Sequence, residues 1–465
     1  MKTLILFGFA LTLLVRPLHA QEVAALGHNE EAIATATDAQ QVTANDAQNI
    51  SDRPDGEKTQ EKAQSQKKEK APKKPVSFTL GKNHPSLSVG SVLKLEFDAR
   101  IESDERMATP AIGLDAAQFD WQHPRLGVTG TLWKKIRFEL TRDPSEGDTK
   151  SPWKDAYVEL RATKAFEVEA GRFKLPFGRE MLTGRTNLDF VYRSLAATEL
   201  SPGRDIGVMT HGRLWGQGLA YQAGYFARDG DNARTKQTSG ARETFAGRIV
   251  LSPFTWMSAN ALASLAIGIA GASSHLDNQL GLRGVSVFGD GVFFDRVYVN
   301  GRRRRTGIDA SWANGPASFS TEYIAVSDER KAMGLVGDDL PKARASAWYV
   351  AGTWALTGEP KHGRLEPRRA LLQGGWGAVE LAARIEKLEF DSLIYPGTSY
   401  GFPNSSRLLT NADLVTTLGI NWYLNRYIKV QPNLVIESIG DPARSPAPTA
   451  AGRFVSSVFR VQFAL

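Results

Sequence analysis

The chain has 465 residues, with 57 Lys and Arg against 50 Asp and Glu, and a formal net charge of +7. Cysteine is absent, which excludes disulfide bonds and thiolate metal sites, and a hydrophobic fraction of 42% is too low for a helical membrane protein. Residues 1–75 are neutral, so the basic excess belongs to residues 76–465. That excess fits nucleic acid, anionic lipid or anionic solutes as partners, and charge alone does not choose among them.

The chain begins with the features of a secretory signal. Lys2 precedes an apolar run over residues 4–15, and Leu18-His19-Ala20 forms a cleavage site. The run is too short to cross a bilayer as a helix, so residues 1–20 are predicted to be a signal peptide. No later window holds the eighteen or more apolar residues that a transmembrane helix needs. An exported chain of this kind is soluble, tethered to a surface, or a β-barrel.

Residues 21–75 are predicted to be disordered. They are rich in Ala, Gln, Glu, Lys and Asp and have almost no large apolar side chains, so they cannot bury enough surface to offset the entropy of ordering. The stretch 57–74 is dense in charge and fits a transient helix or a segment that binds an acidic partner. The simpler interpretation, a solvated tether, is preferred. Residues 76–465 then form the folded domain.

From Val92 onward, apolar residues alternate with polar ones, which predicts β-strands that have one apolar and one charged face. The clearest such segments are 93–100, 132–140, 155–161, 379–385, 417–424, 428–437 and 454–465. Alternation alone fits any half-buried antiparallel sheet, including a soluble sandwich or propeller. The polar phase, however, is full of Arg, Lys and Glu, and the last strand alternates to the end of the chain. Both features favour an outer-membrane barrel.

Aromatic residues at the ends of these segments support the same interpretation, because Trp and Tyr gather at the two interfaces of a membrane. They are Trp133, Trp153, Trp312, Trp354, Trp376, Trp422, Tyr423 and Tyr427. A short turn at 425–427 is followed by a long connection at 438–452, as expected for turns on one side of a barrel and loops on the other. The connection at 357–374 falls on the turn side yet is eighteen residues long.

At about 23 residues for a strand and its connection, residues 92–465 predict a transmembrane antiparallel β-barrel of about 16 strands, wide enough for a water-filled channel. The segments 155–161 and 166–174 are followed by about thirty residues without any period. Unpatterned connections of this length are usually functional loops. We therefore predict that this one folds inward and constricts the channel.

The constriction loop supplies four candidate anion-binding residues, since Arg forks match phosphate and carboxylate oxygens. They are Arg179, Arg185, Arg193 and Arg204. Acidic residues accompany them, so pairing within the loop is the alternative. A second set belongs to the polar phase of the strands and is predicted to line the lumen, where it attracts anions or pairs with wall carboxylates. This set is Lys94, Lys135, Arg137, Arg161, Arg303, Arg305, Arg384 and Arg460.

No catalytic residue, metal site or cofactor is predicted. The seven histidines are scattered without the spacing of a metal-binding pair. The Gly-rich stretches at 212–224 and 281–291 lack the strand and helix that flank a nucleotide-binding loop. The sequence therefore indicates a protein other than an enzyme.

Several stretches of the chain resemble the phosphate-selective porins O and P. The most specific are GRFKLPFGRE (171–180) and SPGRDIGV (201–208); others lie at 125–143, 155–161, 209–231, 297–312, 377–390 and 419–435. The resemblance spans roughly residues 92–465. It implies a 16-stranded, trimeric outer-membrane porin whose third loop turns inward and whose basic residues guide phosphate or polyphosphate.

The preferred hypothesis is a passive channel for small anions, phosphate or polyphosphate foremost, in an outer membrane of the Gram-negative type. Its partners would be the anions, outer-membrane lipid and two further copies of the chain, with no role for nucleic acid. Two alternatives stay open. One is a general anion porin without phosphate specificity, and the other is a plugged structural or adhesive barrel that conducts no ions.

Overall fold

The computed structural model describes residues 76–80, 84–108, 117–144, 153–232, 241–257, 261–288, 291–334, 336–371, 373–392, 410–445 and 452–465. The expected signal peptide (1–20) and polar segment (21–75) lie outside the described residues. Helical elements are short: α2 (Arg179–Leu182), η2 (Arg185–Asn187), η3 (Ala196–Leu200), η4 (Trp215–Gln217) and η6 (Pro442–Arg444). No helix in these ranges is both long enough and apolar enough to span a membrane.

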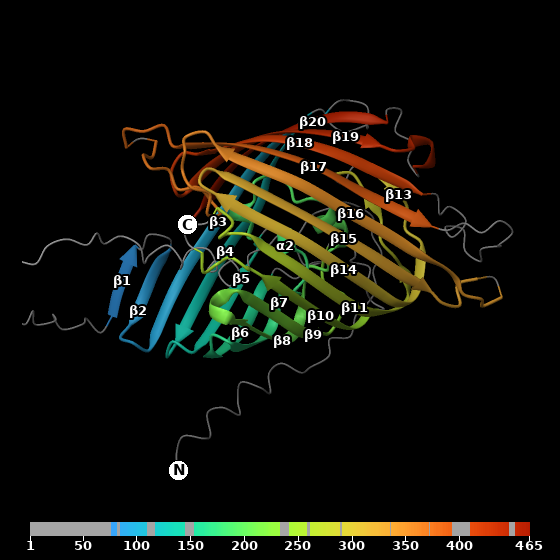
Figure 1. Cartoon of the computed structure of the whole chain (residues 1–465), viewed down its shortest axis with the longest axis horizontal. Helices are drawn as coiled ribbons and strands as arrows, with labels where there is room; N and C mark the ends of the chain where they lie inside the picture. Colours follow the sequence, from blue (N-terminus) through green and yellow to red (C-terminus); the bar gives the residue numbers. More distant parts are fainter. Residues whose placement is uncertain are drawn as a thin grey trace, which may run out of the picture. The chain divides into compact units, whose positions relative to one another are not determined.

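Sixteen long strands of the described residues form one closed antiparallel sheet (Figure 1). They are β3 (Leu93–Ala108), β4 (Ala117–Leu132), β5 (Ile136–Arg142), β6 (Trp153–Thr163), β7 (Phe166–Lys174), β8 (Arg204–Leu214), β9 (Leu219–Phe226), β10 (Ala241–Leu251), β11 (Ala266–Leu280), β14 (Tyr298–Asn314), β15 (Ala317–Arg330), β16 (Leu340–Ala355), β17 (Ala378–Ser392), β18 (Asn411–Tyr423), β19 (Ile428–Ile439) and β20 (Arg453–Ala464). Each pairs with the next along the chain, and β20 pairs with β3 to close the barrel. The predicted barrel of about 16 strands is confirmed.

Two short hairpins accompany the barrel. The first joins β1 (Val76–Leu80) to β2 (Pro85–Val89). Because β20 pairs only with the second half of β3, the first half is left free on that edge, and β2 pairs with it there. The second joins β12 (Gly284–Val285) to β13 (Val292–Phe294) within the connection between β11 and β14.

The barrel has its apolar face outside and its charged face inside, as the alternation predicts. On β10, for example, Phe245 and Ile249 are exposed while Thr244 and Arg248 are buried. A soluble sandwich would bury the apolar phase instead, so its exposure here requires lipid as the solvent of the outer surface. Buried inward-facing charges must then find partners inside the lumen.

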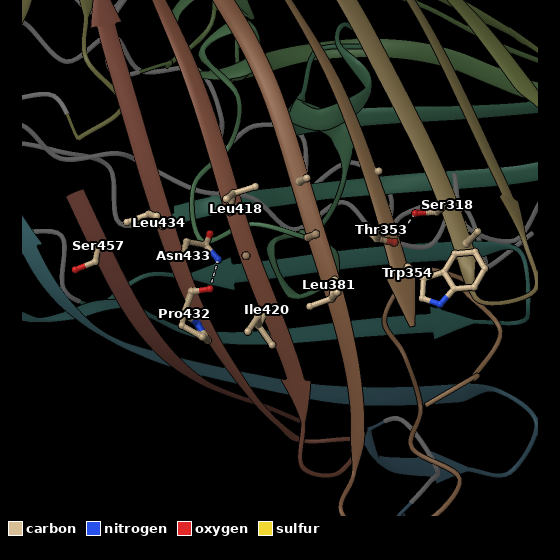
Figure 2. Close-up of a pocket in the computed structure, with 15 residues that line it drawn as sticks. Ser318, Thr353, Trp354, Leu381, Leu418, Ile420, Pro432, Asn433, Leu434 and Ser457 are labelled. Carbon is tan, nitrogen blue, oxygen red and sulfur yellow. Dashed lines mark hydrogen bonds between the residues drawn. The ribbon is translucent and has the colours of Figure 1, made fainter. Parts of the chain in front are cut away.

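The outer surface also carries a groove of about 860 Å³ that crosses the strands from β15 to β20 (Figure 2). Leu381, Leu418 and Leu434 line it, and the small residues Gly352 and Ala383 leave it hollow. Because these side chains belong to the apolar phase, the groove faces the acyl chains of the membrane.

The interfacial aromatic residues are placed as predicted, with one exception. Trp133, Trp354 and Trp376 are exposed at strand ends and in turns. Tyr423, in contrast, ends β18 with its ring buried, and its hydroxyl donates to Glu380 at 3.1 Å. Its assignment to the interface was wrong because Tyr423 falls on the inward phase, opposite to Trp422.

Candidate functional site

Residues 175–203 leave β7, cross the lumen and return to β8, and α2 marks them inside the barrel in Figure 1. Backbone amides of this loop reach the far wall. Arg179 N donates to Oε1 of Glu322 on β15 at 2.6 Å, and Val191 N donates to Oδ1 of Asn433 on β19 at 2.8 Å. The predicted inward-folded loop is therefore present.

The loop has an apolar core of its own, which explains why it folds compactly without a regular period. Leu175, Phe177, Phe190 and Leu200 are each 3% exposed or less. Gly178 enables the turn into α2, because its φ of +77° is a conformation that side chains with a Cβ rarely adopt. Burial of this cluster fixes the loop against the inner wall, so its position does not depend on the charges alone.

Three of the four predicted loop arginines are buried and engaged by protein groups. Arg185 pairs with Glu102 of β3, and Arg204 holds Asp155 of β6 with two hydrogen bonds of 2.8 Å. Arg193 donates to the backbone oxygens of Glu180 and Thr183 within the loop. In this geometry all three anchor the loop, and direct anion contact by them stays a prediction.

Arg179 is the fourth loop arginine and differs from the others. It is half-buried, and its side chain lies close to Tyr349 and to the carboxylates of Asp309 and Glu322 on the opposite wall. Arg179 is thus the member of the predicted set that stays partly open to the channel.

The wall arginines of the second set also lie within ion-pair networks. Arg384 contacts Glu180 of the loop at 3.1 Å and Glu386 at 2.9 Å. Arg460 bonds both oxygens of Asp104 and the backbone oxygen of Val191. The remaining contacts are Arg303 with Asp229 and Asp328, Arg305 with Asp229, Arg137 with Glu139, Arg161 with Glu159, and Lys94 with Glu96.

Lys135 departs from its predicted place. It lies in the exposed turn between β4 and β5 rather than on an inward strand position, because β4 ends at Leu132 and β5 begins only at Ile136. Lys134 interrupts the apolar phase within the turn, but Leu132 and Ile136 share one phase on either side of it, and this concealed the break between the two strands.

The pattern did not reveal three lysines that hold the loop in place. Lys174 donates to the backbone oxygens of Met181, Leu182 and Thr183, and Lys429 donates to those of Thr186 and Leu188. Lys361 lies in the long connection between β16 and β17. Only the position of Lys174 beside the loop, within the GRFKLPFGRE stretch, offered a signal in the sequence.

Lys361 also explains the eighteen-residue connection that did not fit the pattern of short turns. Its Nζ lies 2.6 Å from Oδ1 of Asp189 in the loop and 2.6 Å from Oε1 of Glu380 in the wall. Burial by itself disfavours the charge, but the carboxylates of Asp189 and Glu380 raise the pKa of Lys361 above its usual value. The connection therefore folds onto the mouth of the barrel and fastens the loop from that side.

One inward arginine, Arg125, stands apart from these networks. Arg100 of β3 and Arg125 of β4 are opposed across the two strands, and both side chains are buried on the inner face. Like charges directly opposite each other destabilise a sheet, and Arg125 Nε, Nη1 and Nη2 have no hydrogen-bond partner among the described residues. The nearest opposite charges are Asp143 and Asp155, but Asp155 already binds Arg204. Arg100 pairs with Glu102 at 3.3 Å, so Arg125 is the candidate contact for an anion.

Replacing Arg185 tests whether the loop arginines act on stability or on ions. Arg185→Ala is expected to lower the free energy of unfolding by about 1–3 kcal/mol, since Glu102 loses a buried partner but keeps Arg460 at 3.3 Å. Urea unfolding in detergent measures the change, with Arg444→Ala as an exposed control. A shifted reversal potential at unchanged stability would instead make Arg185 an anion contact.

Comparison with known proteins connects this geometry to a family. A family model described as phosphate-selective porin O and P matches residues 96–437. Porin O of Pseudomonas aeruginosa is 26% identical over 361 residues, which cover 68% of this chain and 75% of Porin O.

Solved structures share the fold at low identity. The trimer form of OmpT, an outer membrane protein of Vibrio cholerae, has a TM-score of 0.52 at 10% identity and covers 80% of this chain and 100% of its own. The outer membrane channel DcaP of Acinetobacter baumannii has a TM-score of 0.50 at 10% identity, covering 81% of this chain and 99% of its own.

Proposed function

Because the chain belongs to the phosphate-selective porin O and P family, we propose that it is a passive, water-filled channel that favours phosphate or polyphosphate among small anions. Membership makes it an outer-membrane porin, a channel rather than an enzyme. The observation that carries the choice of ion is Arg125, buried on the inner wall, whose guanidinium nitrogens have no hydrogen-bond partner among the described residues.

Selective transit depends on how strongly the channel attracts an anion and how readily it releases it. A channel must attract its ion strongly enough to recruit it and weakly enough to let it leave. Most inward arginines of the described residues already have carboxylate partners, so they offer an anion only part of their charge. Arg125, whose guanidinium nitrogens have no hydrogen-bond partner among the described residues, offers more, and one such position fits transit better than a deep trap.

The proposed assembly is a homotrimer in contact with outer-membrane lipid. The barrel fold is shared with an OmpT of Vibrio cholerae whose solved structure is described as a trimer form, and the exposed apolar outer face provides surface for both lipid and neighbouring copies.

A general anion porin is the second candidate, favoured by Glu180, Asp189 and Glu199 beside the loop arginines. Planar-bilayer recordings of the purified protein in a KCl gradient, followed by addition of phosphate, distinguish the candidates. We expect an anion-selective reversal potential and a chloride current that phosphate blocks. Anion selectivity without block would support the general porin, a cation-selective current would overturn both, and no current would indicate a plugged barrel.

A further inference from the structure

A cluster of acidic residues around His211 lies on the inner face, apart from the constriction loop. In the register of β6, β7 and β8, Glu159 is opposite Glu169, and Glu167 is opposite His211. The cluster is close to the short turn between β6 and β7 and hence to the side of the barrel where short turns place the periplasm.

Both ring nitrogens of His211 face carboxylates. Nε2 lies 3.3 Å from Oε1 of Glu159 and 3.8 Å from Oε2 of Glu169, while Nδ1 lies 3.4 Å from Oε2 of Glu167. The side chain is 8% exposed, and Nε2 has no hydrogen-bond partner among the described residues. One ligand atom each from Glu159, Glu167 and His211 lie within 4.8 Å of one another.

The separations of Glu159 and Glu169 from Nε2, 3.3 and 3.8 Å, are close to those in the coordination sphere of a small cation. Zinc binds imidazole nitrogen and carboxylate oxygen at about 2.0–2.2 Å, which places neighbouring ligands of a tetrahedral site about 3.3–3.5 Å apart. A metal-bound histidine normally donates its other ring N–H to a carboxylate. The carboxylates on both sides of His211 allow this, whichever nitrogen takes the metal.

Charge also favours a cation at this position. Glu159 and Glu169 oppose each other across two strands, and Glu167 adds a third carboxylate beside them. Arg161 contacts the cluster through Glu159. Its Nε lies 2.9 Å from Oε2 of Glu159, which is the carboxylate oxygen that does not face His211. Glu167 keeps a side chain that is 22% exposed, which gives an entry route from the channel mouth.

We propose that His211 Nε2, Glu159 and Glu169 bind a divalent transition-metal cation of the Zn²⁺ class at the periplasmic mouth of the channel, with Glu167 accepting the N–H of Nδ1. Imidazole combined with carboxylates suits Zn²⁺ and its neighbours better than Ca²⁺ or Mg²⁺. The separation of these residues along the chain, with the turn and the whole constriction loop between them, explains why no sequence motif indicates the site.

Isothermal titration of the purified full chain in detergent with ZnCl₂ alone tests the proposal without reference to conductance. We expect one Zn²⁺ per chain and a visible ligand-field band when Co²⁺ replaces it. His211→Ala should weaken binding by about tenfold or more, because it removes the only nitrogen ligand of the cluster. His275→Ala is the matched control, since His275 is exposed near Asp277 at 3.5 Å and should leave binding unchanged.

Heat-modifiable gel mobility shows whether each variant is folded. If His211→Ala does not fold, the double variant Glu159→Gln with Glu169→Gln keeps the side-chain volumes and serves in its place. Loss of stoichiometric binding in either folded variant supports the site. Absence of stoichiometric Zn²⁺ binding by the native chain, or equal binding by the native chain and the folded variant, overturns the proposal.

Discussion

Asp229→Ala is expected to lower the free energy of unfolding by about 3–5 kcal/mol, because it leaves two buried guanidinium groups without their shared carboxylate. Asp229 is fully buried and accepts hydrogen bonds from Arg303 Nη1 and Arg305 Nη2, each at 2.8 Å. Arg303 retains the carboxylate of Asp328, but Arg305 retains only the backbone oxygen of Leu200, so the buried charge of Arg305 is left uncompensated. Urea unfolding in detergent, followed by tryptophan fluorescence, gives the midpoint.

The matched control is Asp277→Ala. Asp277 also pairs with an arginine, Arg242, at 2.8 Å, but both side chains are exposed, and such pairs contribute at most about 1 kcal/mol. If the two variants unfold at the same midpoint, burial does not determine how much the Asp229 contacts stabilise the fold. Added formate should partly restore the Asp229 variant, since it supplies a small carboxylate to the two arginines.

The contacts of Asp229 with Arg303 and Arg305 also determine how their contribution to the free energy of unfolding depends on pH. Burial disfavours the ionised carboxyl, but Arg305 and Arg303 together hold the pKa of Asp229 below its ordinary value. A depressed pKa in the folded state means that the stabilisation is complete above the unfolded pKa of about 3.9 and is lost as the pH falls below it. The difference between native and Asp229→Ala chains should therefore stay constant from neutral pH down to about 5.

Arg125→Ala is expected to reduce the anion-to-cation permeability ratio about fivefold. A unit charge about 4 Å from an ion in water contributes about 1 kcal/mol, which corresponds to that factor in local anion concentration. Reversal potentials in a KCl gradient measure the ratio. Phosphate block of the chloride current should weaken in parallel if Arg125 also contacts phosphate.

Two further variants sharpen the result for Arg125. Arg125→Lys keeps the charge but loses the planar fork, so it should retain anion preference while phosphate block declines. Arg242→Ala removes an exposed arginine that already pairs with Asp277 and should leave the permeability ratio unchanged. If Arg125→Ala and Arg242→Ala behave alike, Arg125 has no special role in selecting ions.

The sequence allowed the barrel and its loop to be predicted because both follow from local patterns. Alternation with period two reports which side of a strand faces lipid, and the unpatterned stretch after Lys174 marks the loop. Two residues were misplaced. Lys135 was assigned to a strand but lies in the turn between β4 and β5, and Tyr423 was assigned to the membrane interface but lies on the inward face. Both residues sit within a residue or two of a strand end.

The ion pairs of the site could not be predicted from the sequence, for a different reason. The sequence suggested pairing within the loop as the alternative, but Asp189 of the loop binds Lys361, and Arg185 binds Glu102 of β3. Arg460 and Asp104 lie at opposite ends of the chain and meet only because β20 closes onto β3. Partners of this kind are set by barrel closure, which a single sequence does not display.

The attachment of the loop to several strands has a mechanical consequence. Its residues are bonded to β3 through Glu102, to β15 through Glu322, to β17 through Arg384 and to β19 through Asn433. A thin-walled tube braced across its width resists flattening when the surrounding bilayer presses on it sideways. Changes in lipid thickness or lateral pressure should therefore leave the width of the aqueous path, and with it the single-channel current level, nearly constant.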